Sequence, residues 1–331
     1  MKHPLLALAA LALAAPSQAQ DAAEAPTPAS VVAAAPAADW RAIDPADLMV
    51  MTLAPDREGN PRQVVIQLLP PPFSQGWVEN IRTLAKAHWW DGTTVYRVVD
   101  NWVAQWGDGE DDEAKAKPLP EGLRVVPETE YVVPTNRALP IALGWKGMLD
   151  RDSANPSFAE GHMLFRSSSL EWGLYETYFE GFPVAGLGHN HGADGWPIHC
   201  YASVGVARDL SPDTGTGAEL YAVIGHAPRQ LDRNIAVVGR VIEGIEHLST
   251  LPRGKGDAGV YDDPSLRVPI VSVRLGDEPP ETERPRFEYL EGDSFARYVE
   301  VRANRNDAFY KVPAGGIDVC NVQVPIRRMH E

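Results

Sequence analysis

Short apolar runs separated by turn-forming residues recur along the chain and predict β-strands. The runs at residues 47–53 and 63–69 flank the turn-like stretch 56–61, and this arrangement predicts a hairpin. The prolines at residues 70–72 end the second run, because proline cannot donate a hydrogen bond to a sheet. Further strands are predicted at residues 95–99, 200–206, 220–224, 235–242 and 268–275. We therefore expect a mainly β protein.

Two other segments have the pattern of helices. Between Trp77 and Trp89 the apolar residues recur at steps of three and four, which predicts an amphipathic helix. Ser74 stands where the N-cap of this helix is expected. Residues 245–251 predict a second, shorter helix.

The first 44 residues differ in composition from the rest of the chain. Residues 1–19 combine a basic start, a short Leu/Ala-rich run and a small-residue site, which is the pattern of a secretory signal peptide. The apolar run is too short to span a bilayer, so we expect cleavage after Ala19 and a soluble product exported to the periplasm. Residues 20–44 are rich in Ala and Pro and are interpreted as a linker.

The chain of 331 residues is acidic, with 45 acidic and 30 basic residues and a formal net charge of −15. This excess argues against nucleic acid and anionic lipid as partners, since phosphates need a basic face, and it favours a soluble monomer. Cys200 and Cys320 form either one disulfide of an exported protein or two free buried thiols. The sequence leaves both open, because it does not show the distance between the two residues.

One arginine stands in an unusual setting. Arg97 lies between Val95 and Trp102, in a stretch of β-formers and aromatic residues. A guanidinium is always charged and is rarely buried without a partner. Arg97 is therefore either a structural ion-pair residue or a residue that faces a groove and binds a ligand there.

Several blocks of sequence accompany this arginine, at residues 77–81, 90–94, 217–225, 231–232 and 237–244. Together with Arg97 they resemble the cyclophilin family of peptidyl-prolyl cis–trans isomerases, over residues 63–107 and 201–275. The resemblance implies a mainly β fold: a closed eight-stranded antiparallel barrel with two capping helices.

The resemblance also suggests how the chain is divided. We expect a cyclophilin-like domain at residues 45–277, with an insertion at about residues 118–199, and a C-terminal extension at residues 278–331. The insertion contains too many aromatic residues for a disordered loop. We therefore expect it to fold and to pack on the barrel.

An isomerase of X–Pro bonds needs no nucleophile, metal or cofactor. It needs an apolar pocket for the proline ring and a donor that reaches the proline nitrogen only when the amide is twisted. The resemblance assigns the donor role to Arg97 and a hydrogen bond with the substrate backbone to Gln105. It places the remaining substrate contacts at Trp102, Val103, Ala207, Arg208, Leu220, Tyr221 and Ile235. The expected partners are proline-containing peptides or unfolded exported proteins.

Some of these positions depart from the family pattern. Trp102 and Val103 stand where the family usually has phenylalanine and methionine, Glu219 replaces a glutamine, and Ile235 replaces a histidine of the pocket rim. The donor is retained, so we expect activity, and the larger Trp102 ring favours a modest rate. The alternative is a cyclophilin-fold binding module or chaperone with little turnover, in which the insertion covers the groove or Trp102 blocks it.

A different alternative is a metal site at His189, His191 and His199, with Asp194 nearby, because His and Asp can bind zinc. No fourth ligand is evident, and a His-Asn-His sequence in a glycine-rich loop is commonly exposed to solvent. We therefore predict no metal and no cofactor.

Overall fold

The computed structural model describes residues 25–110, 112, 114–135, 165–166, 174–189, 192–312 and 315–329. The signal peptide expected at residues 1–19 lies outside the described residues. Within them, no helix is both long enough and apolar enough to cross a membrane.

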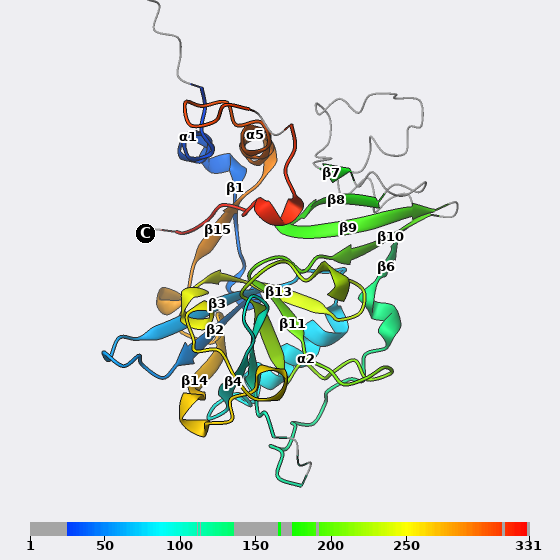
Figure 1. Cartoon of the computed structure of the whole chain (residues 1–331), viewed down its shortest axis with the longest axis vertical. Helices are drawn as coiled ribbons and strands as arrows, with labels where there is room; N and C mark the ends of the chain where they lie inside the picture. The colour runs from blue at the N-terminus through cyan, green and yellow to red at the C-terminus, as the bar shows by residue number, and fades with distance from the viewer. Residues whose placement is uncertain are drawn as a thin grey trace, which may run out of the picture.

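Eight antiparallel strands form a closed barrel in the lower part of Figure 1. Going round the barrel, the order is β11 (Ser203–Val206), β12 (Leu220–Val223), β5 (Val103–Gly107), β4 (Thr94–Val98), β14 (Val268–Leu275), β2 (Leu48–Leu53), β3 (Arg62–Leu68) and β13 (Val237–Glu243). This arrangement confirms the mainly β, closed eight-stranded antiparallel fold.

The predicted hairpin of β2 and β3 shows how the barrel is filled. Side chains alternate between the two faces of a strand, so Met51 and its partner Val64 point into the barrel core. Leu48 and Val65 point outward and pack against Phe287 of the C-terminal extension. Both faces of β3 are therefore covered, which explains its nearly continuous apolar sequence.

The predicted amphipathic helix is α2 (Gln75–Lys86), which buries Trp77, Ile81 and Leu84 in the barrel core. Ser74 is the N-cap residue, as predicted, but its side chain makes no capping hydrogen bond. Glu130 of the expected insertion instead accepts from the Gly76 amide at 3.1 Å.

The second helix, α4, is shorter than predicted and spans Glu246–Ser249. Short 3-10 helices lie at η1 (Ala37–Asp39), η2 (Pro45–Asp47), η3 (Glu128–Tyr131), η5 (Arg229–Leu231), η6 (Asp257–Gly259), η7 (Pro264–Leu266), η8 (Glu281–Glu283) and η9 (Val319–Asn321).

The N-terminal segment and the C-terminal extension fold together, at the upper left of Figure 1. They form α1 (Pro28–Ala34), β1 (Trp40–Ala42), β15 (Phe287–Leu290), α5 (Gly292–Ala303) and β16 (Ile326–Arg328), with the sheet order β1-β15-β16. We expected residues 20–44 to be a linker, and from residue 28 onward this interpretation is corrected. Trp40 is buried against Leu290 and Phe295, and the backbone of β1 pairs with β15, so this part of the chain is held in place.

The expected insertion contributes a five-stranded sheet beside the barrel, at the upper right of Figure 1. Its strands are β6 (Val133–Thr135), β7 (Phe165–Arg166), β8 (Leu174–Phe179), β9 (Phe182–His189) and β10 (Gly192–Pro197), in the order β6-β10-β9-β8-β7. Phe182 and Val184 join the barrel core, and the Phe179 ring meets Phe73 edge-on with centroids 5.7 Å apart. The sheet is therefore attached to the barrel by apolar contacts.

A half-buried arginine attaches this sheet to the barrel. Arg240 on β13 donates from Nε and Nη2 to Gln67 Oε1, at 3.0 and 2.8 Å, and from Nη1 to the Gly181 carbonyl. Its guanidinium also lies over the Phe182 ring, 4.5 Å from the centroid. No carboxylate of the described residues pairs with it, and burial lowers the pKa of Arg240 to about 10.

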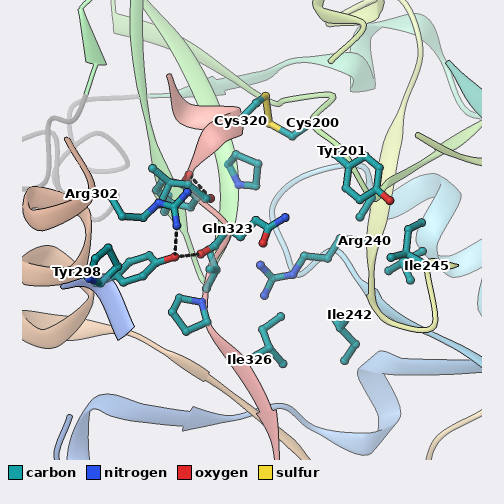
Figure 2. Close-up of a pocket in the computed structure, with 18 of the residues that line it drawn as sticks. Cys200, Tyr201, Arg240, Ile242, Ile245, Tyr298, Arg302, Cys320, Gln323 and Ile326 are labelled. Carbon is teal, nitrogen blue, oxygen red and sulfur yellow. Dashed lines mark hydrogen bonds between the residues drawn. A yellow bond between two sulfur atoms is a disulfide. The ribbon is translucent and has the colours of Figure 1, made fainter. Parts of the chain in front are cut away.

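Arg240 also lines a cavity of about 1010 Å³ between the barrel, the insertion and the terminal segments (Figure 2). Cys200 and Cys320 lie at its edge and form a disulfide, with their Cα atoms 5.0 Å apart. The structure thus decides between the two states that the sequence left open. The disulfide ties the C-terminal extension to the segment that leads into β11.

Candidate active site

The predicted donor, the predicted glutamine and one pocket residue form a row across three barrel strands. Arg97 on β4 stands opposite Gln105 on β5, and Gln105 stands opposite Tyr221 on β12. Because neighbouring side chains on a strand alternate, these residues share the outer face of the barrel, whereas Ala104 and Trp106 point into the core.

The Arg97 guanidinium is held by its own chain at two of its three nitrogens. Nε donates to the Ala258 carbonyl at 2.6 Å, and Nη1 donates to Gln105 Oε1 at 2.7 Å. The group lies 5.3 Å from the centroid of the Trp102 ring. Nη2 makes no hydrogen bond with any residue that the structure describes. Burial lowers the pKa of Arg97, and no described carboxylate pairs with it.

A polar chain behind Arg97 holds Gln105 in place. Gln105 accepts from Arg97 and donates through Nε2 to the Tyr96 hydroxyl, so both ends of its amide are used. Burial, followed by the adjacent Glu219 carboxyl, raises the pKa of Tyr96. Glu219 itself accepts from the Asp108 amide at 2.7 Å, and burial raises the pKa of its carboxyl.

An apolar cluster continues the row beside Gln105. Val103, Tyr221 and Val223 are buried in it, and the half-buried residues Val99, Trp102, Ala207 and Ile235 pack against them. Five of the predicted substrate-binding residues therefore lie together. We call Arg97, Gln105, Trp102, Val103, Ala207, Tyr221 and Ile235 the Arg97 face. None of the described residues from 118–199 belongs to this cluster.

Two predicted contact residues are placed differently. Leu220 is 0% exposed and lies in the barrel core, so the prediction that its side chain binds substrate is wrong. Its neighbour Tyr221 takes the outer face because side chains alternate along β12. The Arg208 side chain turns toward the loop before β13 and donates from Nε and Nη2 to the Asn234 carbonyl, at 3.0 and 2.9 Å.

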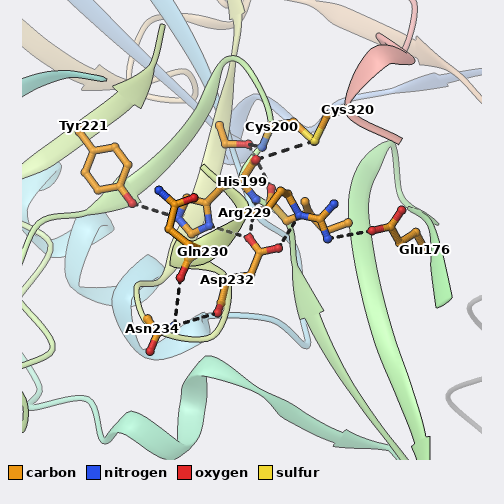
Figure 3. A network of polar contacts seen from close by, with 11 residues as sticks. Glu176, His199, Cys200, Tyr221, Arg229, Gln230, Asp232, Asn234 and Cys320 are labelled. Atoms are coloured by element: carbon orange, nitrogen blue, oxygen red, sulfur yellow. Dashed lines mark hydrogen bonds and ion pairs between the residues drawn. A yellow bond between two sulfur atoms is a disulfide. The ribbon is translucent and has the colours of Figure 1, made fainter. Parts of the chain in front are cut away.

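The histidines considered as metal ligands do not come together in the described part of the chain. His199 is 0% exposed and contacts the Asp232 carboxylate and the Tyr221 hydroxyl (Figure 3). His191 and the side chain of His189 lie outside the described residues. Within those residues, no group of three or more His, Cys, Asp or Glu side chains could hold a metal ion. The contact of His199 with Tyr221 was missed, because no sequence motif links the two residues.

Comparison with known families agrees with this geometry. Residues 76–275, more than half of the chain, match the model of the cyclophilin type peptidyl-prolyl cis-trans isomerases. The chain belongs to the cyclophilin family. A search of curated proteins found no match.

Two solved structures are similar to this cyclophilin. Cyclophilin AquaCyp293 from Hirschia baltica is 21% identical, with a TM-score of 0.62, and the match covers 92% of this chain and 98% of that one. A cyclophilin type isomerase from Cryptosporidium parvum is 10% identical, with a TM-score of 0.35, over 70% of this chain and 99% of that one. The first comparison shows that the fold is shared along most of the chain, including the parts outside the barrel.

Proposed function

We propose that this cyclophilin isomerises X–Pro bonds of exported proteins and that Arg97 stabilises the twisted amide. The barrier to rotation, about 18–20 kcal/mol, comes from amide resonance, and twisting the bond leaves a lone pair on the proline nitrogen. A donor that meets this lone pair only in the twisted state lowers the barrier. The observation that carries the proposal is the position of Arg97, which has Nη2 unused by the described residues and stands beside an apolar cluster.

The other residues of the Arg97 face suit the binding of an extended peptide. The cluster around Val103 and Tyr221 offers apolar surface for the proline ring. The carbonyl oxygen of the Gln105 side chain has two lone pairs, so it can accept from a peptide amide while it accepts from Arg97. The resemblance implies that Ala207 and Arg208 offer backbone groups to the peptide, and Ala207 packs against the cluster. This chemistry requires no cofactor.

Export is supported by two independent features. Residues 1–19 have the pattern of a secretory signal peptide. The Cys200–Cys320 disulfide is typical of proteins in oxidising compartments such as the periplasm. The proposed substrates are therefore unfolded or folding proteins of that compartment. Fractionation of cells that produce the full chain tests the location, and retention of the protein in the cytosol would contradict it.

The decisive experiment measures isomerisation of a short X–Pro peptide by wild type and by Arg97→Ala. We expect Arg97→Ala to lower kcat/KM at least tenfold, which corresponds to about 1.4 kcal/mol of barrier. Arg62→Ala is the matched control, because Arg62, on β3, is also half-buried and makes no ion pair within the described residues, but its Nε donates to the Ala54 carbonyl. Full activity in a folded Arg97→Ala protein would overturn the role of Arg97.

The same experiment tests the alternative of a binding module with little turnover. One observation favours it: Arg97 already donates to Ala258 and Gln105, so only Nη2 is left for a substrate. A folded wild type that binds an X–Pro peptide but does not accelerate its isomerisation would support this alternative.

A further inference from the structure

A chain of five polar side chains joins the insertion sheet to the Arg97 face (Figure 3). It starts at Glu176 on β8 and runs through Arg229, Asp232 and His199 to Tyr221. The reaction proposed above involves only the last member of this chain. The exposed fractions of the other four side chains lie between 0% and 31%. The proposed reaction does not explain why these polar groups are held away from water.

Each step of the chain is a short polar contact. Arg229 Nη2 lies 2.8 Å from Glu176 Oε1, and Arg229 Nε donates to Asp232 Oδ2 at 2.6 Å. The other oxygen of Asp232 lies 2.9 Å from His199 Nδ1 and also accepts from the His199 backbone amide. His199 Nε2 lies 2.9 Å from the Tyr221 hydroxyl.

These contacts determine which atoms carry the protons. A carboxylate can only accept, so the proton of the neutral His199 ring is on Nδ1, facing Asp232. Nε2 then accepts, and the Tyr221 hydroxyl donates to it. Asp232 in this way sets the direction of the hydrogen bond that reaches Tyr221.

Tyr221 is confined from several sides. The His199 ring lies nearly parallel to the Tyr221 ring, at an interplanar angle of 12°. On the neighbouring strand, a Cβ atom at Gly205 would lie 2.3 Å from the Tyr221 hydroxyl oxygen, so only glycine leaves room for the ring. A buried hydroxyl without a partner is costly. The hydrogen bond with His199 therefore selects one position of the ring.

The same chain holds the loop that carries Ile235. Arg229 and Asp232 belong to this loop, and Glu176 binds it from the insertion side. Asn234 donates to the Gln230 and Asp232 carbonyls within the loop, and its own carbonyl accepts from Arg208. Two members of the Arg97 face, Tyr221 and Ile235, thus depend on contacts that end at the insertion.

We propose that His199 is a positioning residue for Tyr221, and that the insertion supports the substrate-binding surface through Glu176 and Arg229. The proposal rests on the proposed function, because it assigns Tyr221 to substrate contact. Arg97 is not part of the chain, so weakening the chain should disturb binding of the proline ring more than the donor. The effect should therefore appear mainly in KM, with a smaller change in kcat.

A double-mutant cycle on the full-length chain tests this coupling. The variants are Tyr221→Phe, which keeps the ring and removes the hydroxyl, Glu176→Gln, and the two combined. We expect KM for an X–Pro peptide to rise about fivefold in Tyr221→Phe and about threefold in Glu176→Gln. The KM of the double variant should equal that of Tyr221→Phe, because removal of the hydroxyl already breaks the polar contacts that link Glu176 to residue 221. Glu180→Gln, at the exposed turn after β8, is the matched control and should leave KM unchanged.

Two other results would contradict the proposal. If the two effects multiply to about fifteenfold in the double variant, Glu176 acts independently of Tyr221 and the coupling is refuted. If neither single variant changes KM, the chain does not position the substrate-binding surface. These variants avoid the fully buried His199, whose replacement risks misfolding.

A second readout does not depend on activity. The ¹⁵N resonances of the His199 ring should show a single tautomer with the proton on Nδ1, and Tyr221→Phe should shift the Nε2 resonance. An unchanged Nε2 resonance would overturn the His199–Tyr221 contact. An inert wild type with this contact intact would overturn the proposed function and with it the effect on KM, while the contact itself would stand.

Discussion

Arg97 and Arg240 are both half-buried, and neither pairs with a described carboxylate. Burial lowers the pKa of each guanidinium, and each lies near an aromatic ring. In these respects the two sites are alike. They lie on different parts of the barrel, Arg97 on β4 and Arg240 on β13.

The two arginines differ in how their donors are used. All three nitrogens of Arg240 donate to Gln67 or Gly181. The guanidinium therefore joins the barrel to the turn between β8 and β9. Arg97 leaves Nη2 without a partner among the described residues. A buried cation without a carboxylate is therefore not enough to indicate a functional site. The indicative feature is a donor that the protein itself does not use.

The largest expected difference comes from replacing each arginine by alanine. Arg240→Ala should lower the free energy of unfolding by about 3 kcal/mol, because it leaves the Gly181 carbonyl without its donor and opens space beside Phe182. Arg97→Ala should lower that free energy by only about 1 kcal/mol, because Ala258 is exposed and water can replace the lost donor there. Urea unfolding of both variants measures the contrast.

The losses of kcat/KM in the two variants should have the reverse order of their losses of stability. Arg240→Ala should keep nearly wild-type kcat/KM at a temperature where it is folded, whereas Arg97→Ala should lose most of it. An Arg240→Ala protein that is stable but inactive would show that the comparison between a structural and a functional arginine is wrong.

The disulfide near Arg240 also contributes to the stability of this part of the molecule. Cys200 and Cys320 close a separation of 120 residues and anchor the C-terminal extension beside the cavity that Arg240 lines. The double variant Cys200→Ser/Cys320→Ser should lower the free energy of unfolding by about 2 kcal/mol, near the lower end of the usual range. Unfolding of wild type in a reducing agent should give the same loss, and the double variant should not respond to that agent. Equal stability with and without the disulfide would contradict this prediction.

The smallest effect is expected behind Arg97, at Glu219. Burial raises the pKa of this carboxyl above its ordinary value of 4.5, so the folded protein binds the proton more tightly than the unfolded chain does. The contribution of Glu219 to stability is therefore present at low pH and is lost as the pH rises through the folded pKa. Glu219→Gln keeps an oxygen that can accept from the Asp108 amide and removes the charge.

Unfolding free energies of wild type and Glu219→Gln at several pH values test this sign. The stability of Glu219→Gln relative to wild type should increase from pH 4.5 to pH 8. A difference that stays constant, or that decreases with pH, would show that the folded protein does not favour the protonated carboxyl.

Much of the barrel could be predicted from local patterns. The runs at residues 47–53 and 268–275 became β2 and β14 with nearly the same bounds, because half-buried strands need alternating or continuous apolar residues. The helix at residues 77–89 was found from its three- and four-residue steps, and Ser74 is its N-cap residue. The side chain that accepts from its first turn belongs to Glu130, 54 residues from Gly76, and no local pattern reveals such a partner.

The candidate site was only partly predictable for the same reason. The resemblance placed Arg97, Gln105 and Tyr221 in one region, and the register of β4, β5 and β12 brings them into one row. It could not separate Leu220 from Tyr221, because all four residues of β12 are buried and the strand has no charged side chain that marks its outer face.

Local patterns and motifs were enough to predict most of the barrel strands, the main helix and the family, since these depend on neighbours within a few positions or on motifs read in order. The tertiary structure alone decided that Trp40 is folded against Leu290, that Cys200 pairs with Cys320, and that His199 reaches Tyr221. Those contacts join segments that are separated by tens to hundreds of residues. They form only when the closed barrel and the sheets packed on it bring the segments within hydrogen-bonding or packing distance.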